Sequence, residues 1–225
     1  FLGAVANDGD ADRFMGIGAL PALGGQSRLV EINGNHAMLA LAENQAGIVG
    51  TEYTNSGLVR RLEQQGVAFE YCANGDVNVT AALRDKQAGG QPWTRGGEFT
   101  GHLIDTEWLS SGDGVRMAGW LAAYAATSGR TFGDLYQELP LWSEQMVKIP
   151  FESIERDDIK QSERVASLLH SAKETLGDNG RLIVRASGTE PVVRIWGESA
   201  STHHKRLNTI VANLTLAVRA EKEAS

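Results

Sequence analysis

The alternation of short apolar runs with amphipathic segments between residues 47 and 88 constrains the fold of this chain most strongly. Residues 47–51 and 67–72 are apolar runs of strand length, whereas residues 57–64 and 77–88 carry apolar side chains at helical spacing. Gly66 follows the first helical segment and suits a left-handed helix end. Helices that alternate with strands in this way pack on a largely parallel sheet, so the pattern predicts an α/β domain. Ligands of such sheets bind in loops at the carboxyl ends of the strands.

The remaining segments predict three domains, which span residues 1–32, 33–143 and 144–225. The first has expected strands at 1–6, 14–17 and 28–32 and a turn at 21–26, and regular secondary structure is expected to be interrupted at 33–35. The second adds helices at 36–43, 112–128 and 132–139; we expect the 112–128 helix to be well buried and Thr131 with Asp134 to cap the last. The third is a small α+β unit with strands at 146–151, 181–186 and 192–197 and helices at 157–176 and 201–220.

The overall charge excludes some classes of partner. The net charge of −7 over 225 residues argues against non-specific nucleic-acid binding, which requires a basic surface. Cys72 is the single cysteine and cannot form an internal disulfide, and no secretory leader or long apolar span is visible. We therefore expect a cytoplasmic protein that binds neither nucleic acid nor membranes. Because the chain begins with Phe1 directly in a strand, we also expect it to be a fragment of a longer protein.

Three carboxylates at alternate positions, Asp8, Asp10 and Asp12, follow the first apolar run and are followed by Arg13. Such a loop can direct three oxygens at one Mg²⁺, which prefers carboxylates, water and phosphate oxygens. A solvated acidic turn is the alternative. A calcium loop of the EF-hand type is excluded, because Arg13 and Ala19 stand where Gly and Glu are needed. An aspartyl-nucleophile phosphatase using Asp8 is a second alternative, although Asp12 stands where that class has a hydroxyl.

A second candidate site is the loop at residues 185–194, between two expected strands. Arg185 and Arg194 flank it, and Ser187, Gly188 and Thr189 lie near its tip. Two guanidinium groups, two hydroxyls and inward-turned amides can hold a phosphate. A plain hairpin turn with solvent-facing arginines fits the composition equally well.

A third candidate site is the glycine-rich segment 96–102. Glu98, Thr100 and His102 alternate in it and can share one face of an extended loop. Together, a carboxylate, a hydroxyl and an imidazole suit the hydroxyl groups of a sugar. A single histidine is more often structural than functional, so the neighbours of His102 carry this interpretation.

In their order along the chain, these motifs resemble those of the α-D-phosphohexomutase superfamily. The matching segments are Asp8-Gly9-Asp10-Ala11-Asp12-Arg13, Gly50-Thr51 with Asn55 and Gly57, Gly97-Glu98-Phe99-Thr100-Gly101-His102, Gly112-Asp113-Gly114, and Arg185-Ala186-Ser187-Gly188-Thr189-Glu190-Pro191. Within the superfamily, the bacterial phosphoglucosamine mutases are the nearest match. The resemblance covers the later part of the family's chain: the end of the α/β second domain, a complete three-layer α/β third domain, and an α+β fourth domain.

The resemblance implies a mechanism and a role for each motif. In the family, a phosphoserine on the first domain passes its phosphoryl group to a hexose phosphate, which isomerises 6-phosphate and 1-phosphate through a bisphosphate. Mg²⁺ would be held by Asp8, Asp10 and Asp12, with Arg13 steadying the transferring oxygens. Sugar hydroxyls would be bound by Glu98, Thr100 and His102, and the non-reacting phosphate by Arg185, Ser187, Gly188, Thr189 and Arg194.

The sequence departs from the family pattern at three points. The serine loop is absent, so we expect the isolated chain to be inactive without a first domain. Thr100 stands where the family usually has Ser, and Gly75-Asp76-Val77-Asn78-Val79 lacks the arginine of the corresponding family segment. The expected substrate is glucosamine phosphate, with mannose or glucose phosphates as alternatives. A sugar-phosphate-binding module without catalysis is the alternative function.

Overall fold

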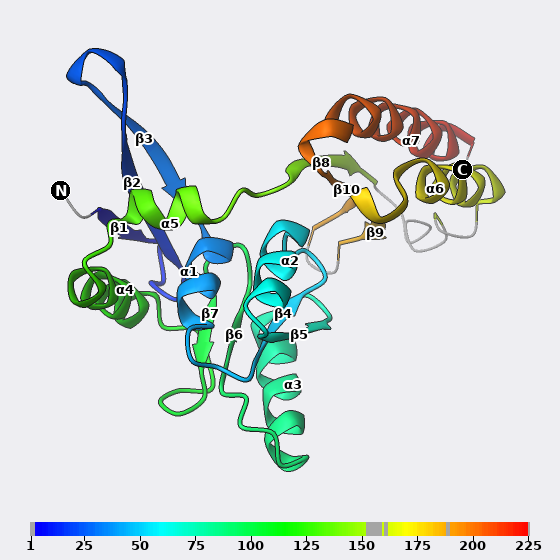
Figure 1. Ribbon diagram of the computed structural model, residues 1–225. Helices are drawn as coiled ribbons and strands as arrows, with labels where there is room; N and C mark the ends of the chain where they lie inside the picture. The colour runs from blue at the N-terminus through cyan, green and yellow to red at the C-terminus, as the bar shows by residue number, and fades with distance from the viewer. Residues whose placement is uncertain (1–2, 152–158, 160–161, 188–189, 225) are drawn as a thin grey trace. The chain divides into compact units, whose positions relative to one another are not determined.

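The computed structural model describes residues 3–151, 159, 162–187 and 190–224 (Figure 1). The chain forms two compact units, Phe1–Leu141 and Trp142–Ser225, and each is described here by itself. Among the described residues, no helix has both the length and the apolar content needed to cross a bilayer.

The first unit begins with a three-stranded antiparallel sheet in sequence order, β1 (Ala4–Asn7), β2 (Phe14–Pro21) and β3 (Ser27–Ile32). Asn7 pairs with Phe14, so the six residues between them form the loop that joins β1 to β2. Strand β2 is longer than predicted because its pairing with β3 continues to Pro21, opposite Ser27. The short helical turn η1 (Leu23–Gly25) closes this hairpin, which extends away from the rest of the unit (Figure 1).

Alternation along these strands gives the small sheet one buried and one open face. Phe14 and Ile32 are fully buried, whereas Met15, Ile17 and Leu29 are 47%, 43% and 66% exposed. The sheet therefore packs on the α/β layer with one face and presents an apolar surface with the other.

The α/β layer contains the four-stranded sheet β5-β4-β6-β7. Strand β4 (Gly47–Thr51) is parallel to both β5 (Ala68–Cys72) and β6 (Arg95–Gly97), and β7 (Leu103–Asp105) is antiparallel to β6. The α/β prediction is thereby confirmed, and β4 has the predicted bounds. The short strands β6 and β7 were not predicted.

Helices cover both faces of this sheet. The side chain of Ile48 packs in one core cluster with α1 (Gly34–Leu41) and α2 (Ser56–Gln64), and that of Val49 packs in another with α3 (Asp76–Ala88). Since successive side chains of a strand point to opposite faces, α1 and α2 lie on one face and α3 on the other. The three-layer arrangement explains why β4 is buried along its whole length.

Capping side chains fix where the helices begin. Asn33 was expected in an interruption between elements, but its side chain accepts a hydrogen bond from Asn35 N, and α1 begins at Gly34. Asn55 caps α2 in the same way by accepting from Gly57 N. The capping box predicted for α5 (Phe132–Glu138) is present, with Thr131 and Asp134 as its reciprocal pair.

Helix α4 (Gly114–Ser128) corrects the prediction of a well buried helix. Only one face is buried, through Met117, Ala118, Leu121 and Ala125, and the other side is open to solvent. Its aromatic residues Trp120 and Tyr124 stack on each other at the edge of the core, 5.4 Å between ring centroids. The high apolar content therefore reflects a half-buried helix with stacked aromatic rings.

The second unit is an antiparallel sheet of order β8-β10-β9 packed with two helices, as the α+β prediction required. Its strands are β8 (Ser143–Pro150), β9 (Gly180–Ala186) and β10 (Val192–Ser199), and its helices are α6 (Glu163–Leu176) and α7 (His204–Ala224). The short helical turns η3 (Gly177–Asn179) and η4 (Ser201–His203) adjoin β9 and α7. Val193, Ile195, Leu207 and Leu214 form part of its core.

The predicted start of the 157–176 helix was wrong. Ser162 caps α6 by accepting from Val165 N, so the helix begins at Glu163. Residues 157–158 and 160–161, which fall in the predicted range, lie outside the described residues.

Candidate functional site

The loop between β1 and β2 gathers its three aspartates. One carboxylate oxygen each from Asp8, Asp10 and Asp12 lies within 4.8 Å of the others. Two oxygens on one Mg²⁺ are separated by roughly 3–4 Å, since each lies about 2.1 Å from the ion. In addition, Asp12 Oδ1 is buried without a hydrogen-bond partner among the described residues. The oxygens and the vacant acceptor fit a small hard cation.

Backbone contacts hold this loop in shape. The amide of Ala11 donates to the carbonyl of Asp8 at 3.2 Å, and Ala11 adopts a positive φ of 62°. The amide of Gly114, at the start of α4, donates to the carbonyl of Ala11 at 3.0 Å. A β-carbon at residue 114 would overlap the carbonyl of Arg13, so glycine is needed for this close approach. Gly114, from the predicted 112–114 motif, therefore supports the acidic loop.

Arg13 lies against the carboxylates that precede it. Its backbone amide donates to Asp8 Oδ1 at 3.2 Å, and its Nε lies 3.5 Å from Asp8 Oδ2. The side chain is 46% exposed, so its guanidinium retains access to solvent. Arg13 partly balances the negative charge of the loop and can turn toward an incoming anion.

A chain of hydrogen bonds connects the acidic loop to the predicted sugar-binding residues. His102 lies between two carboxylates, with Nε2 at 2.7 Å from Asp12 Oδ2 and Nδ1 at 2.8 Å from Glu98 Oε2. The other oxygen of Glu98 accepts from the amide of Gly75 at 2.8 Å. Two predicted sites, 90 residues apart in sequence, are thus parts of one polar cluster.

The two carboxylates shift the protonation of His102. The hydrogen bond to Glu98, with that to Asp12, raises the pKa of His102 to about 9 despite its burial. The hydrogen bond from His102 lowers the pKa of Asp12. Burial would raise the pKa of Glu98, but bonds from His102, Gly75 and Thr100 hold it below its usual value. In the metal-free chain this raised pKa favours the protonated imidazole at neutral pH, with one ring nitrogen facing each carboxylate.

The backbone brings Glu98, Thr100 and His102 together by a different route from the one predicted. The segment is a tight turn between β6 and β7 and not an extended loop, with Glu98 N donating to His102 O at 2.8 Å and Gly101 N to Glu98 O at 3.0 Å. Gly101 has a φ of +97°, and a β-carbon there would overlap the carbonyl of Phe14. Thr100 Oγ1 lies 3.4 Å from Glu98 Oε2. The three polar groups therefore meet around the carboxylate of Glu98.

Sequence reasoning missed the role of Gly75, whose amide orients Glu98. Gly75 has a φ of +119° and immediately precedes α3. Its motif was noted for a lost arginine, and only the fold shows that its backbone contacts the site. Asn7 was also missed: its Nδ2 donates to the carbonyl of Arg13 at 2.8 Å and closes the acidic loop at its base.

In the second unit, Arg185 and Arg194 are direct cross-strand partners on β9 and β10. Ser187 is 2% exposed, and its hydroxyl accepts from Glu190 N at 3.2 Å. Gly188 and Thr189 lie outside the described residues. The two guanidinium groups of the predicted phosphate loop are therefore paired by strand register.

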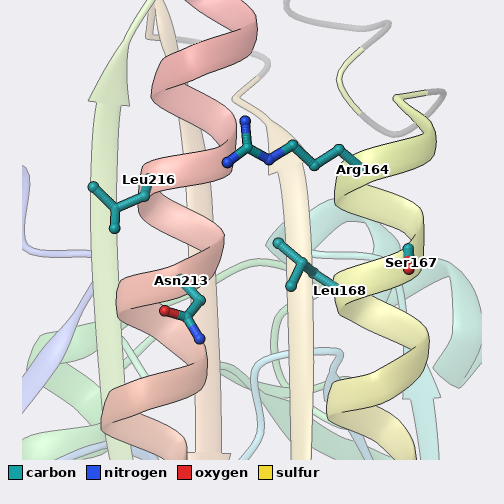
Figure 2. A pocket seen from close by; sticks show the side chains of 5 residues that line it. All are labelled: Arg164, Ser167, Leu168, Asn213 and Leu216. Atoms are coloured by element: carbon teal, nitrogen blue, oxygen red, sulfur yellow. The ribbon is translucent and has the colours of Figure 1, made fainter.

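A separate hollow lies between α6 and α7 in the second unit and is lined by Arg164, Ser167, Leu168, Asn213 and Leu216 (Figure 2). Arg164 reaches from α6 toward α7 across it (Figure 2). None of the predicted site residues lines this hollow. It is distinct from the phosphate loop.

Comparison with known proteins assigns the family. The family model described as "Phosphoglucomutase/phosphomannomutase, alpha/beta/alpha domain III" matches residues 33–141, and that of the C-terminal domain matches residues 146–214. The chain belongs to this family, the α-D-phosphohexomutases.

Curated relatives are named phosphoglucosamine mutase. That of Streptomyces griseus is 31% identical over 210 residues, which cover 90% of this chain and 43% of the relative. That of Thioalkalivibrio sulfidiphilus is 30% identical over 223 residues, which cover 96% and 46%. The chain thus spans less than half the length of these relatives.

Solved structures share the fold. An Aspergillus fumigatus N-acetylphosphoglucosamine mutase, in complex with GlcNAc-6P and magnesium, has a TM-score of 0.73 at 18% identity, covering 96% of this chain and 52% of that one. A phosphoglucomutase/phosphomannomutase family protein from Burkholderia thailandensis has a TM-score of 0.68 at 22% identity, covering 96% and 46%. The α/β and α+β architecture is that of the family.

Proposed function

We propose that this chain is the sugar-binding and phosphate-binding part of a phosphohexomutase that converts glucosamine 6-phosphate to glucosamine 1-phosphate. The name shared by its curated relatives supports this substrate. The proposed division is the end of a second domain at residues 1–32, a third domain at 33–143 and a fourth at 144–225. Mannose and glucose phosphates are the alternative substrates of the same site.

The hydrogen-bonded cluster that joins Asp12, His102 and Glu98 carries the proposal. It joins an acidic loop that would bind a cation to groups that can bind sugar hydroxyls. A mutase needs this proximity, because the metal acts on the phosphoryl group while the sugar is held next to it. A solvated acidic turn gives no reason for Asp12 to bond to a buried histidine.

Asp8, Asp10 and Asp12 would hold Mg²⁺, and a magnesium complex of a structural neighbour supports this assignment. When bound, the ion supplies positive charge that stabilises a transferring phosphoryl group. Arg13 would turn its exposed guanidinium toward the oxygens of that group. Since Asp8 and Asp12 would then be occupied by the cation, Arg13 would be released from its present contact with Asp8.

The sugar would be held by Glu98, Thr100 and His102. The carboxylate of Glu98 is oriented by Gly75 and His102 before any ligand binds, so it can accept from a sugar hydroxyl without reorganising. The non-reacting phosphate would be held by Arg185, Ser187, Gly188, Thr189 and Arg194. A fixed phosphate contact would let the sugar bind in either of its two orientations.

The phosphoryl carrier in this proposal is a phosphoserine on a first domain, so we propose that the chain is inactive in isolation. The test is reassembly: the chain is mixed with the separately expressed first half of a phosphoglucosamine mutase, Mg²⁺, glucose 1,6-bisphosphate and glucosamine 6-phosphate. We expect mutase turnover that depends on both pieces and is lost in an Asp10→Asn variant. Demonstrated association without turnover would contradict the proposal.

Two controls separate the alternatives. Tight sugar-phosphate binding by the chain, together with no turnover in any reassembled mixture, would favour a binding module. Covalent trapping of beryllofluoride at Asp8 would favour a phosphatase. Rates with mannose 6-phosphate and glucose 6-phosphate in the same mixture would decide between the candidate sugars.

A further inference from the structure

The phosphate loop of the second unit stands beside a third cation that no motif indicated. Arg194 on β10 pairs in register with Arg185 on β9 and with Lys148 on β8. In an antiparallel sheet, directly paired residues project from the same face, so the three basic side chains form one row across the sheet. In a chain of net charge −7, this is a local concentration of positive charge.

The row already binds an anion, the carboxylate of Glu190. Lys148 Nζ lies 3.1 Å from Glu190 Oε1 and 3.0 Å from Oε2, and Arg194 Nη2 lies 2.5 Å from Oε2. Both cations lower the pKa of Glu190, the hydrogen bond from Arg194 being the larger effect. Glu190 is therefore ionised and occupies the position in which an external anion would meet these two cations.

The fit of this carboxylate is incomplete. The Nε of Arg194 is buried and has no acceptor among the described residues. A carboxylate offers two oxygens and one charge, whereas a phosphate monoester offers three terminal oxygens and nearly two charges. A phosphate can therefore satisfy more donors of this row than Glu190 does.

The contact between Glu190 and Lys148 is open to water and can be replaced at small cost. The Lys148 and Glu190 side chains are 48% and 43% exposed, and an ion pair this open to water contributes little free energy. Arg194 is only 19% exposed, so its contact with Glu190 is the one that a ligand has to replace in kind. The backbone beneath the carboxylate stays in place, because Glu190 N donates to Ser187 Oγ and Val192 N donates to Glu190 O. Rotation of the Glu190 side chain would therefore uncover Lys148 and Arg194 without moving this backbone.

We propose that Lys148 is a third phosphate-binding cation and that Glu190 is an internal counter-ion that a phosphate dianion displaces. This inference rests on the proposed role of the 185–194 loop in holding the non-reacting phosphate. Glu190 offsets one of the three positive charges of the row between ligands, and it sets the affinity by competing with the phosphate. The device selects dianionic phosphates over singly charged anions, which would gain little by replacing a carboxylate.

A purely structural ion pair makes the opposite prediction. If Glu190 only aligned Arg194 and Lys148 for a ligand, removing its charge would weaken phosphate binding. If Glu190 competes with the ligand, removing its charge strengthens binding. The sign of the effect therefore distinguishes the two roles.

The experiment measures binding of inorganic phosphate and of glucosamine 6-phosphate to the full chain by isothermal titration calorimetry. We expect Glu190→Gln to tighten both by about threefold to tenfold, a range typical of one partly exposed charge contact. In that background Lys148→Met should lose a similar factor. In the wild-type background Lys148→Met should have a smaller effect, because the substitution also removes one of the two cations that hold Glu190 in the competing position. Urea unfolding confirms that each variant is folded.

The ion pair of Lys86 and Glu70 in the first unit, with side chains 22% and 41% exposed, provides the control. Lys86→Met and Glu70→Gln should leave phosphate affinity unchanged. Weaker or unaltered binding by Glu190→Gln, or no loss from Lys148→Met in its background, would overturn the inference. If Arg194→Gln also leaves binding unaltered, the proposed phosphate loop itself fails, and the two failures are thereby distinguished.

Discussion

The two hydrogen bonds of the His102 imidazole lead to a quantitative prediction about how stability depends on pH. His102 is the link between the acidic loop and the turn at residues 98–102, and its side chain is 11% exposed. Its pKa is raised from 6.5 to about 9, mainly by the hydrogen bond to Glu98. A group that binds its proton more tightly in the folded chain stabilises the fold while it is protonated.

The size of the effect follows from the shift. A rise from 6.5 to about 9 corresponds to about 3 kcal/mol, at about 1.4 kcal/mol per pKa unit. This stabilisation is fully present below pH 6.5, the unfolded value, and is lost as the pH rises through 9. About 2 kcal/mol of it should disappear between pH 6 and pH 8 by the same relation. The lowered pKa of His36 opposes this loss near pH 6, and the raised pKa of Cys72 adds to it near pH 9. The difference between wild type and a His102 variant therefore isolates the contribution of His102.

The assay is urea unfolding of the metal-free chain in EDTA between pH 6 and pH 9, followed by backbone NMR signals of the first unit. His102→Gln should be less stable than wild type at pH 6, and the difference in unfolding free energy between the two should shrink by about 2 kcal/mol between pH 6 and pH 8. His170→Gln is the matched control, because its side chain is 76% exposed and pairs only with Glu174 among the described contacts. The same pH slope in wild type and His102→Gln would refute the reasoning, as would an NMR titration of His102 centred near 6.5.

Four further predictions test other parts of the structure. Burial lowers the pKa of His36 to about 4, so the fold should lose about 3 kcal/mol as the pH falls from 6.5 to 4, a loss that denaturation of His36→Gln should not show. Gly101→Ala should cost about 1–3 kcal/mol, measured by thermal unfolding, because φ is +97° and the carbonyl of Phe14 blocks a β-carbon. Asp10→Asn should weaken Mg²⁺ binding at least about tenfold by calorimetry, while stability changes by less than about 0.5 kcal/mol since Asp10 is exposed. Leu207→Ala should destabilise the second unit by about 2–5 kcal/mol in urea and leave NMR signals of the first unit unchanged, because Leu207 is fully buried in the second core.

Local sequence patterns were sufficient where structure depends on neighbouring residues. Strand β4 and the capping box of α5 were predicted because apolar runs and reciprocal capping groups act within a few residues. The α/β and α+β classes followed from the same periodicities. The gathering of Asp8, Asp10 and Asp12 also depends on one short loop.

Features that depend on distant pairings could not be predicted in this way. Strands β6 and β7 contain three residues each, too few for a period to be visible, yet their pairing forms the turn that orients Glu98. The bond between His102 and Asp12 joins residues that only the tertiary fold brings together. Lys148 is one lysine on a strand until the register places it opposite Arg194.

The contacts of Glu98 give this carboxylate two tasks that a single substitution would confound. Its oxygens accept from Gly75, His102 and Thr100, so it joins the segment before α3 to the acidic loop while presenting remaining lone pairs to a ligand. A glutamine at this position can accept from Gly75, but its amide nitrogen can face His102 only if the imidazole gives up a proton. Loss of turnover in Glu98→Gln therefore reports on the protonation of His102 as well as on sugar binding. The affinity of the Glu98→Gln variant for glucosamine 6-phosphate should be compared with its affinity for inorganic phosphate. A loss for the sugar phosphate alone reports on the sugar contact, because inorganic phosphate does not need that contact.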